Sequence, residues 1–182
     1  MLPAMPSHPI PLCVATLVIV AASSDITSRR IPNRLVAIGV AGALIAQCVL
    51  HGIGAGATAW LAGAATGFFM LLPFYLLRGM AAGDVKLMLA VGAWVGPALT
   101  VYIAVATFIA GGVGALAMVI WQGRMRQLFA NMRVIAIRAA VRGQGGASVA
   151  PVEGESVGAL PYGVAIALGT LSMLFAASAA SI

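Results

Sequence analysis

The chain has 182 residues, of which 62% are hydrophobic and only 8% are charged, and its mean hydropathy is +1.08. A soluble domain carries about 25% charged residues to cover its surface, so most of this surface must face lipid. The composition predicts an integral membrane protein and excludes an ordinary soluble domain. The net charge of +6 indicates membrane orientation rather than a nucleic-acid partner, because the basic residues flank apolar runs.

Six apolar segments can be marked along the chain. They cover residues 6–24, 35–50, 57–77, 82–96, 98–121 and 159–179. Most have about the 20 residues that a helix needs to cross a hydrocarbon core of ~30 Å. The predicted fold is an all-α integral membrane protein in which residues 1–182 form one domain with six transmembrane helices.

The basic residues are distributed on one side of this arrangement. All ten lie in the connections after the first, third and fifth segments, or at the start of the fourth: Arg29, Arg30, Arg34, Arg78, Lys86, Arg124, Arg126, Arg133, Arg138 and Arg142. Basic loops stay in the cytoplasm. The asymmetry predicts that both termini lie outside, with the basic connections inside.

The longest connection, residues 122–158, divides into two parts. Residues 124–142 have helical character with apolar and basic sides, which predicts a cytoplasmic interfacial helix on anionic lipid. Residues 143–158 are rich in Gly and Ser, which is typical of a flexible loop. A simple tether and a role in gating substrate are both open interpretations.

Two of the four acidic residues lie at the ends of apolar segments. Asp25 ends the first segment, which runs inward, and Asp84 begins the fourth, which runs outward. Both carboxyls are therefore expected at one depth, near the cytoplasmic edge of the bilayer. The other two, Glu153 and Glu155, fall in the long connection.

Such a pair of carboxyls suits peptide hydrolysis. Two neighbouring carboxyls share a proton, so one can activate a water while the other donates to the developing oxyanion. Each aspartate also suits a structural role: Asp25 in a turn before Arg29, and Asp84 at the positive amino-terminal end of a helix. The positions alone leave both interpretations open.

Three local sequences carry a resemblance. Residues 25–33 read Asp-Ile-Thr-Ser-Arg-Arg-Ile-Pro-Asn, residues 79–87 read Gly-Met-Ala-Ala-Gly-Asp-Val-Lys-Leu, and residues 160–163 read Leu-Pro-Tyr-Gly. In this order, in a six-span chain, they resemble the type IV prepilin peptidases, in particular the short CpaA/TadV-like form of tight-adherence (Flp) pilus systems. The likeness covers nearly the whole chain.

The resemblance implies an aspartyl endopeptidase of the bacterial inner membrane that removes the leader of prepilins or pseudopilins at the cytoplasmic face. The catalytic pair would be Asp25 and Asp84, acting without metal or cofactor. The chain lacks the paired CxxC motifs of longer, methylating members, so we expect cleavage without methyl transfer. Ala81 stands where the Gly-x-Gly-Asp motif has its first glycine, which puts the geometry before Asp84 in question. Supporting positions are Gly83, Lys86, Pro32, Asn33, Pro161, Tyr162 and Gly163.

Physical roles can be assigned to some of these neighbours. Asn33 is expected to cap the second helix. Lys86 is expected to reach toward lipid headgroups or to lower the proton affinity of Asp84. Tyr162 suits either an interfacial aromatic belt or a substrate contact.

Two other functions fit the same composition. A small proton-coupled transporter or channel subunit would also use membrane carboxyls, although such sites usually lie near the midplane. A non-catalytic assembly protein of a secretion system would tolerate substitution of either aspartate. The sequence leaves the precursor and the oligomeric state open.

Overall fold

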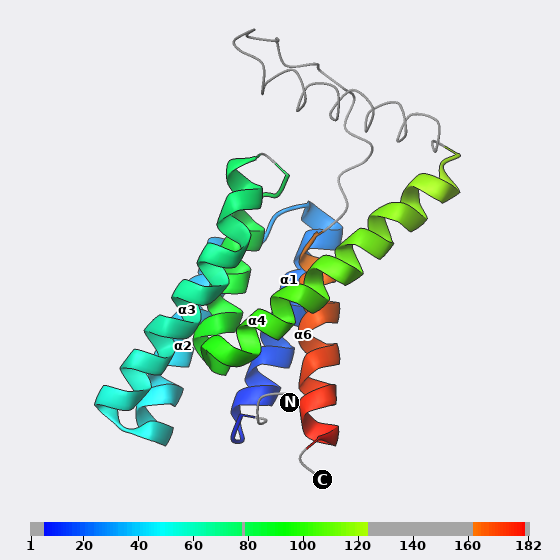
Figure 1. Ribbon diagram of the computed structural model, residues 1–182. Coiled ribbons are helices and arrows are strands. Elements are labelled where there is room, and N and C mark those ends of the chain that lie inside the picture. The colour runs from blue at the N-terminus through cyan, green and yellow to red at the C-terminus, as the bar shows by residue number, and fades with distance from the viewer. Residues whose placement is uncertain (1–5, 78, 124–161, 181–182) are drawn as a thin grey trace, which may run out of the picture. The chain divides into compact units, whose positions relative to one another are not determined.

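The computed structural model describes residues 6–77, 79–123 and 162–180, which form five α-helices and no strand (Figure 1). All five are long and apolar enough to cross a membrane. The predicted all-α class is therefore confirmed for the described residues. The helices are α1 (Ile10–Ser28), α2 (Asn33–His51), α3 (Ile53–Leu76), α4 (Ala82–Trp121) and α6 (Tyr162–Ala179).

Helix α1 extends further toward its carboxyl end than the predicted segment 6–24. Polar side chains sustain the last turn, because the Thr27 hydroxyl donates to the Ser23 carbonyl at 3.0 Å and the Ser28 hydroxyl donates to the Ser24 carbonyl at 2.7 Å. Such bonds to the preceding turn let hydroxyl residues remain helical. Asp25 consequently lies inside a helix and not after its end.

The fourth and fifth predicted segments lie in the single element α4, so the described chain contains five such helices where the sequence predicted six. The division predicted at Gly96 is nevertheless visible, because Gly96 is non-helical with φ 78°. Backbone with such a φ favours glycine, and the following Pro97 cannot donate a helical hydrogen bond. A Cβ on Gly92 would lie 3.2 Å from a methyl carbon of Thr100, whereas eight residues of straight helix span about 12 Å. The chain therefore turns sharply at Gly96, so that the residues just before it lie close to those just after it.

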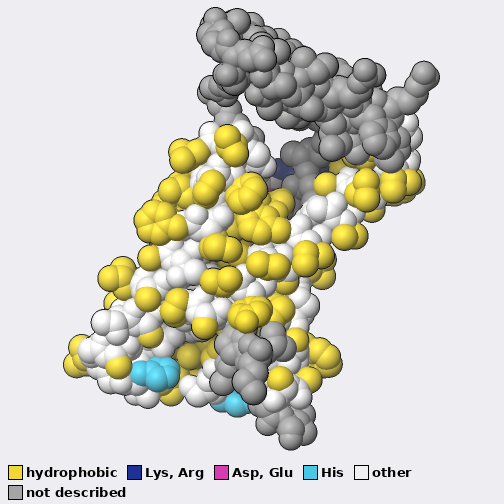
Figure 2. Space-filling model, viewed as in Figure 1, with side chains coloured by type: hydrophobic (Ala, Val, Ile, Leu, Met, Phe, Trp, Pro, Cys, Tyr) yellow, Lys and Arg dark blue, Asp and Glu magenta, His cyan; other side chains and the backbone are white. Residues whose placement is uncertain are grey.

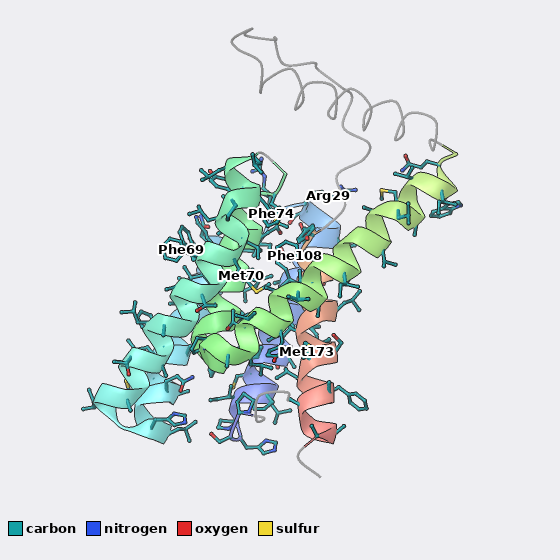
Figure 3. The ribbon with its side chains drawn as sticks, in the orientation of Figure 1. Arg29, Phe69, Met70, Phe74, Phe108 and Met173 are labelled. Carbon is teal, nitrogen blue, oxygen red and sulfur yellow. The ribbon has the colours of Figure 1, made fainter. Side chains whose placement is uncertain are left out.

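Glycines allow close packing of α3 against the first part of α4. A Cβ on Gly63 would clash with the Gly92 carbonyl, and one on Gly67 would clash with the Met88 carbonyl. Small residues let membrane helices approach backbone to backbone. Figure 3 labels Phe74 of α3, whose ring lies 4.6 Å, centroid to centroid, from that of Phe108 in the second part of α4.

Apolar side chains dominate the visible surface in Figure 2. Large ones are strongly exposed, including Val49 and Phe175, both at 78%. Water would penalise such a surface, but lipid does not. The fold therefore fits a membrane protein.

The chain divides into two compact units. The first comprises Met1–Gly111 and Pro161–Ile182, and the second is Gly112–Leu160. Of the second unit the structure describes residues 112–123, which end α4. The predicted interfacial helix 124–142 and the loop 143–158 lie outside the described residues. Every contact discussed below lies within the first unit.

Candidate active site

Asp25 is positioned by the last turn of α1. Its side chain is 7% exposed, and its backbone carbonyl accepts the N–H of Arg29 at 3.0 Å. Arg29 adopts a left-handed conformation with φ 53° and ends the helix; Figure 3 labels it at this end of α1. The helix therefore holds a buried carboxyl one turn before the chain leaves for α2.

Asp84 is positioned by the first turn of α4. Its side chain is 5% exposed, and its Oδ2 accepts the backbone N–H of Ala81 at 3.2 Å. The Asp84 N–H donates in return to the Ala81 carbonyl at 3.1 Å. The bond from the Ala81 N–H to the Asp84 side chain is the N3 half of a helix capping box, so Asp84 has the structural role that its position suggested. It uses one carboxyl oxygen for that role.

The backbone conformation of Ala81 shows whether an alanine can stand where the Gly-x-Gly-Asp motif has its first glycine. Among the described residues other than glycine, only Arg29 has a positive φ. Ala81 therefore does not occupy the left-handed region in which a Cβ is unfavourable. The alanine is compatible with the geometry before Asp84.

Helix α6 brings a third element to the aspartates. The backbone N–H of Gly163 donates to Oδ2 of Asp25 at 2.9 Å, in a buried bond between residues 138 positions apart. A Cβ on Gly163 would lie 2.9 Å from that oxygen and 3.1 Å from the Asp25 Cβ. Glycine is required here for close approach, because a side chain would occupy the space of the carboxyl.

The charge of Asp84 interacts with both Asp25 and Tyr162. Asp25 and Asp84 are close enough for their charges to interact, and the charge of Asp84 also reaches Tyr162. α1, α4 and α6 thus bring residues from distant parts of the sequence to one site.

The connection between α1 and α2 packs against the start of α4. A Cβ on Gly83 would lie 3.4 Å from the Ile31 Cβ, in ordinary contact. Lys86 Nζ donates to Asn33 Oδ1 at 3.1 Å, and both side chains are exposed. This bond links the beginnings of α2 and α4.

Asn33 does not cap α2, contrary to the sequence-based expectation. The cap position is Pro32, with φ −63° and ψ 128°, and no side chain bonds to the free N–H groups there. The Asn33 oxygen is directed to Lys86 instead. Residue type alone indicated a cap, but the neighbouring helix supplies a stronger, charged donor.

The predicted site residues are brought together in large part. Three direct hydrogen bonds involve them: Gly163 to Asp25, Ala81 to Asp84, and Lys86 to Asn33. Pro161 lies outside the described residues. Sequence reasoning missed Gly111, which lies under the Tyr162 ring, because a glycine in an apolar run is ordinary and only the tertiary contact singles it out.

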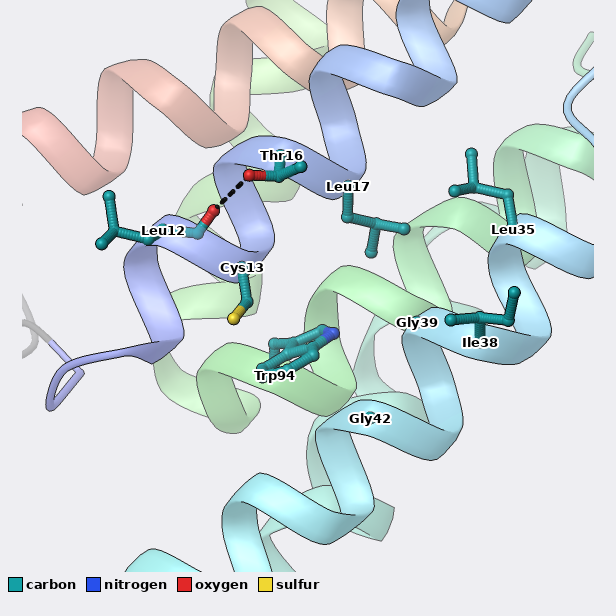
Figure 4. Close-up of a pocket in the computed structure, with 9 residues that line it drawn as sticks. All are labelled: Leu12, Cys13, Thr16, Leu17, Leu35, Ile38, Gly39, Gly42 and Trp94. Carbon is teal, nitrogen blue, oxygen red and sulfur yellow. Dashed lines mark hydrogen bonds between the residues drawn. The ribbon is translucent and has the colours of Figure 1, made fainter.

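An apolar groove of about 400 Å³ lies elsewhere in the first unit, between α1, α2 and the first part of α4 (Figure 4). Its lining contains neither aspartate: Leu12, Cys13, Thr16, Leu17, Leu35, Ile38, Gly39, Gly42 and Trp94. The hydroxyl of Thr16 is already donated to the Leu12 carbonyl at 2.9 Å. The groove is therefore apolar and is not lined by the aspartates.

The hydrogen bonds of each buried carboxyl engage one of its two oxygens. Within the described part of the chain, the side-chain hydrogen bonds of Asp25 and Asp84 each engage Oδ2 and not Oδ1. Two buried carboxyls that interact through their charges are suited to divide the base and acid roles of a hydrolysis between them. The described residues contain no group of three or more His, Cys, Asp or Glu that would hold a metal ion.

The model of the type IV leader peptidase family matches residues 12–116. The matched region covers more than half of the chain and includes both aspartates. No curated protein and no solved structure matches the chain.

Proposed function

Because the chain belongs to the type IV leader peptidase family, we propose that it is a membrane aspartyl endopeptidase that removes the leader peptide of type IV prepilins. In this proposal Asp25 and Asp84 are the catalytic dyad. The sequence as given contains no paired CxxC motif, and it resembles the CpaA/TadV-like form of the family. Both features support cleavage without methyl transfer, and the resemblance supports an Flp-type precursor.

One observation carries the proposal. Asp25 and Asp84 are both buried and lie within range of each other's charge, although they come from different helices. Burying a carboxyl costs free energy unless it is paired and hydrogen-bonded, so a membrane protein that retains two of them is expected to use them. Placing two of them at the ends of apolar helices favours a chemical role over two independent caps.

The chemistry follows from this pair. The ionised carboxyl takes a proton from a water, whose oxygen attacks the carbonyl carbon of the scissile peptide bond. The protonated carboxyl donates a hydrogen bond to the oxygen that becomes negative. When the C–N bond breaks, a proton passes to the leaving amine, which gives one new carboxyl and one new amino terminus. The dyad ends with one proton, as it began.

The membrane arrangement that fits this activity has six crossings, with α4 crossing twice about Gly96. Both termini lie outside, and the aspartates lie at the cytoplasmic edge of the bacterial inner membrane. Lysine and arginine in the connections near the aspartates support this orientation. A precursor would meet the site from the cytoplasm, where its polar leader remains in water.

The test is cleavage of a prepilin co-expressed with the wild-type protein, Asp25→Asn or Asp84→Asn, followed as a mobility shift. Asparagine keeps the side-chain shape and removes the titrating proton, so either substitution is expected to abolish cleavage. Thr170→Val is the control: it removes a buried hydroxyl that bonds to the Ile166 carbonyl at 2.7 Å, away from the aspartates, and should cleave normally.

Membrane abundance of each variant is measured in parallel. Cleavage by both asparagine variants at normal abundance would show that the aspartates are structural, as a non-catalytic assembly protein requires. If wild type cleaves none of several prepilins, and proton-coupled transport is lost in both asparagine variants, the results would favour the transporter.

A further inference from the structure

Gly111 lies in the second part of α4, buried beneath the aromatic ring of Tyr162. A Cβ on Gly111 would lie 2.9 Å from one ring carbon of Tyr162 and 3.0 Å from both the hydroxyl-bearing carbon and the hydroxyl oxygen. Contacts this short are nearly absent from real structures. The ring therefore occupies the space that any side chain at position 111 would need.

Tyr162 is the first residue of α6, and its neighbour Gly163 donates to Asp25. The first N–H groups of a helix have no partner within the helix, so the Gly163 N–H is free for a carboxyl. It also lies at the positive end of the helix dipole, which favours a negative partner. The same helical turn carries both the Tyr162 side chain and this N–H.

We propose that Gly111 is a positioning residue for the active site. Because Gly111 has no side chain, the Tyr162 ring can pack against it, and this contact holds the first turn of α6 so that the Gly163 N–H points to Asp25. The inference rests on the proposed function and adds a contact that neither aspartate makes. Gly111 touches no reacting group and acts through α6 alone.

The expected effect is on the chemical step. An added methyl at position 111 must displace the far end of the Tyr162 ring. We expect the first turn of α6, which carries this ring, to adjust with it and to change the bond to Asp25. A catalytic group misplaced by about 1 Å costs on the order of a hundredfold in rate. If the contact with Asp25 carries the effect, the change falls in kcat and leaves KM close to its wild-type value. A raised KM with an unchanged kcat would show instead that Tyr162 serves substrate binding, and it would overturn the inference.

The adjacent glycine provides a matched control. A Cβ on Gly112 meets nothing within 4 Å among the described residues, and its position is exposed. Gly111→Ala and Gly112→Ala make the same chemical change on the same helix, and alanine favours helix over glycine at both. A difference between them therefore reports the contact with Tyr162.

The experiment measures kcat and KM for cleavage of a prepilin by the purified full chain in detergent or vesicles. Gly111→Ala is expected to lower kcat by roughly ten- to a hundredfold with KM within about twofold of wild type. Gly112→Ala should stay within about twofold of wild type in both constants. An unchanged kcat in Gly111→Ala overturns the inference.

A double-mutant cycle keeps the test decisive if Gly111→Ala accumulates poorly. Tyr162→Leu removes the ring that the methyl would strike, so Gly111→Ala should have little further effect on kcat or abundance in that background. Additive losses would overturn the inference, because they would show that position 111 acts without Tyr162. If wild type itself does not cleave, the proposed function fails first; if wild type cleaves and Gly111→Ala cleaves equally well, only the positioning role fails.

Discussion

The backbone N–H of Gly163 donates a 2.9 Å hydrogen bond to Oδ2 of Asp25, which precedes it by 138 residues. This bond joins the start of α6 to the end of α1, and it is buried. It holds one oxygen of the carboxyl, and in the proposed mechanism the other oxygen is the one used for chemistry. α6 is therefore part of the aspartate site, although it carries no acidic residue itself.

Gly163→Ala is expected to lower the cleavage rate by tenfold or more. The new Cβ would lie 2.9 Å from the Asp25 oxygen, so the carboxyl must turn or α6 must move, and a group of the proposed dyad loses its alignment. Rates of prepilin cleavage, normalised to membrane abundance, provide the measurement.

Gly169→Ala separates this effect from general damage to α6. Its Cβ would lie 2.5 Å from the Thr107 hydroxyl oxygen and 2.7 Å from the Thr107 amide nitrogen, so it disturbs packing on the same helix, away from Asp25. Lower abundance with a near-normal rate per molecule is expected. Equal loss of rate in the two variants would mean that packing, not the carboxyl contact, controls activity.

Ala81→Gly is expected to keep cleavage within about threefold of wild type, because either residue supplies the backbone N–H that Asp84 accepts. Ala81→Pro removes this donor and should slow cleavage more strongly, since a lost hydrogen bond to a charged group costs about 1.5–3 kcal/mol. The comparison uses single-turnover cleavage with saturating enzyme. Strong impairment by glycine would contradict the backbone geometry at position 81.

The bond from Lys86 to Asn33 predicts coupled effects of the two side chains. Lys86→Met and Asn33→Ala should each reduce cleavage modestly, by roughly two- to fivefold, because an exposed contact of this kind contributes about 1 kcal/mol or less. The double variant should be little worse than either single one. If Lys86 interacts only with lipid headgroups, Asn33→Ala should leave cleavage unchanged, and the double variant should show no coupling between the two side chains.

Labelling with a membrane-impermeant thiol reagent tests the six-crossing arrangement. The background carries Cys13→Ser and Cys48→Ser, which removes both native cysteines. Single cysteines at His51 and Pro97, both exposed, should react from the outer side of spheroplasts, whereas one at Arg30 should react only after lysis. Labelling of Arg30→Cys in intact spheroplasts would reverse the proposed orientation.

Several features of the fold could be predicted from the sequence because their causes are local. The apolar runs specify membrane helices by their length, and Gly96 followed by Pro97 specifies the break in α4 through backbone chemistry. Hydropathy placed the end of α1 too early, because it treats serine and threonine as polar and ignores their bonds to the preceding turn. The scarcity of acids identified Asp25 and Asp84 as candidates.

The tertiary structure alone decided which residues surround those acids. The helices are apolar on nearly all sides, so hydrophobic periodicity does not reveal which side faces another helix. Two close contacts depend on how each helix is rotated about its axis: the hydrogen bond from Gly163 to Asp25 and the packing of the Tyr162 ring against Gly111. Composition determines that this chain enters the membrane, whereas the packing of α1, α4 and α6 determines that its two aspartates share one site.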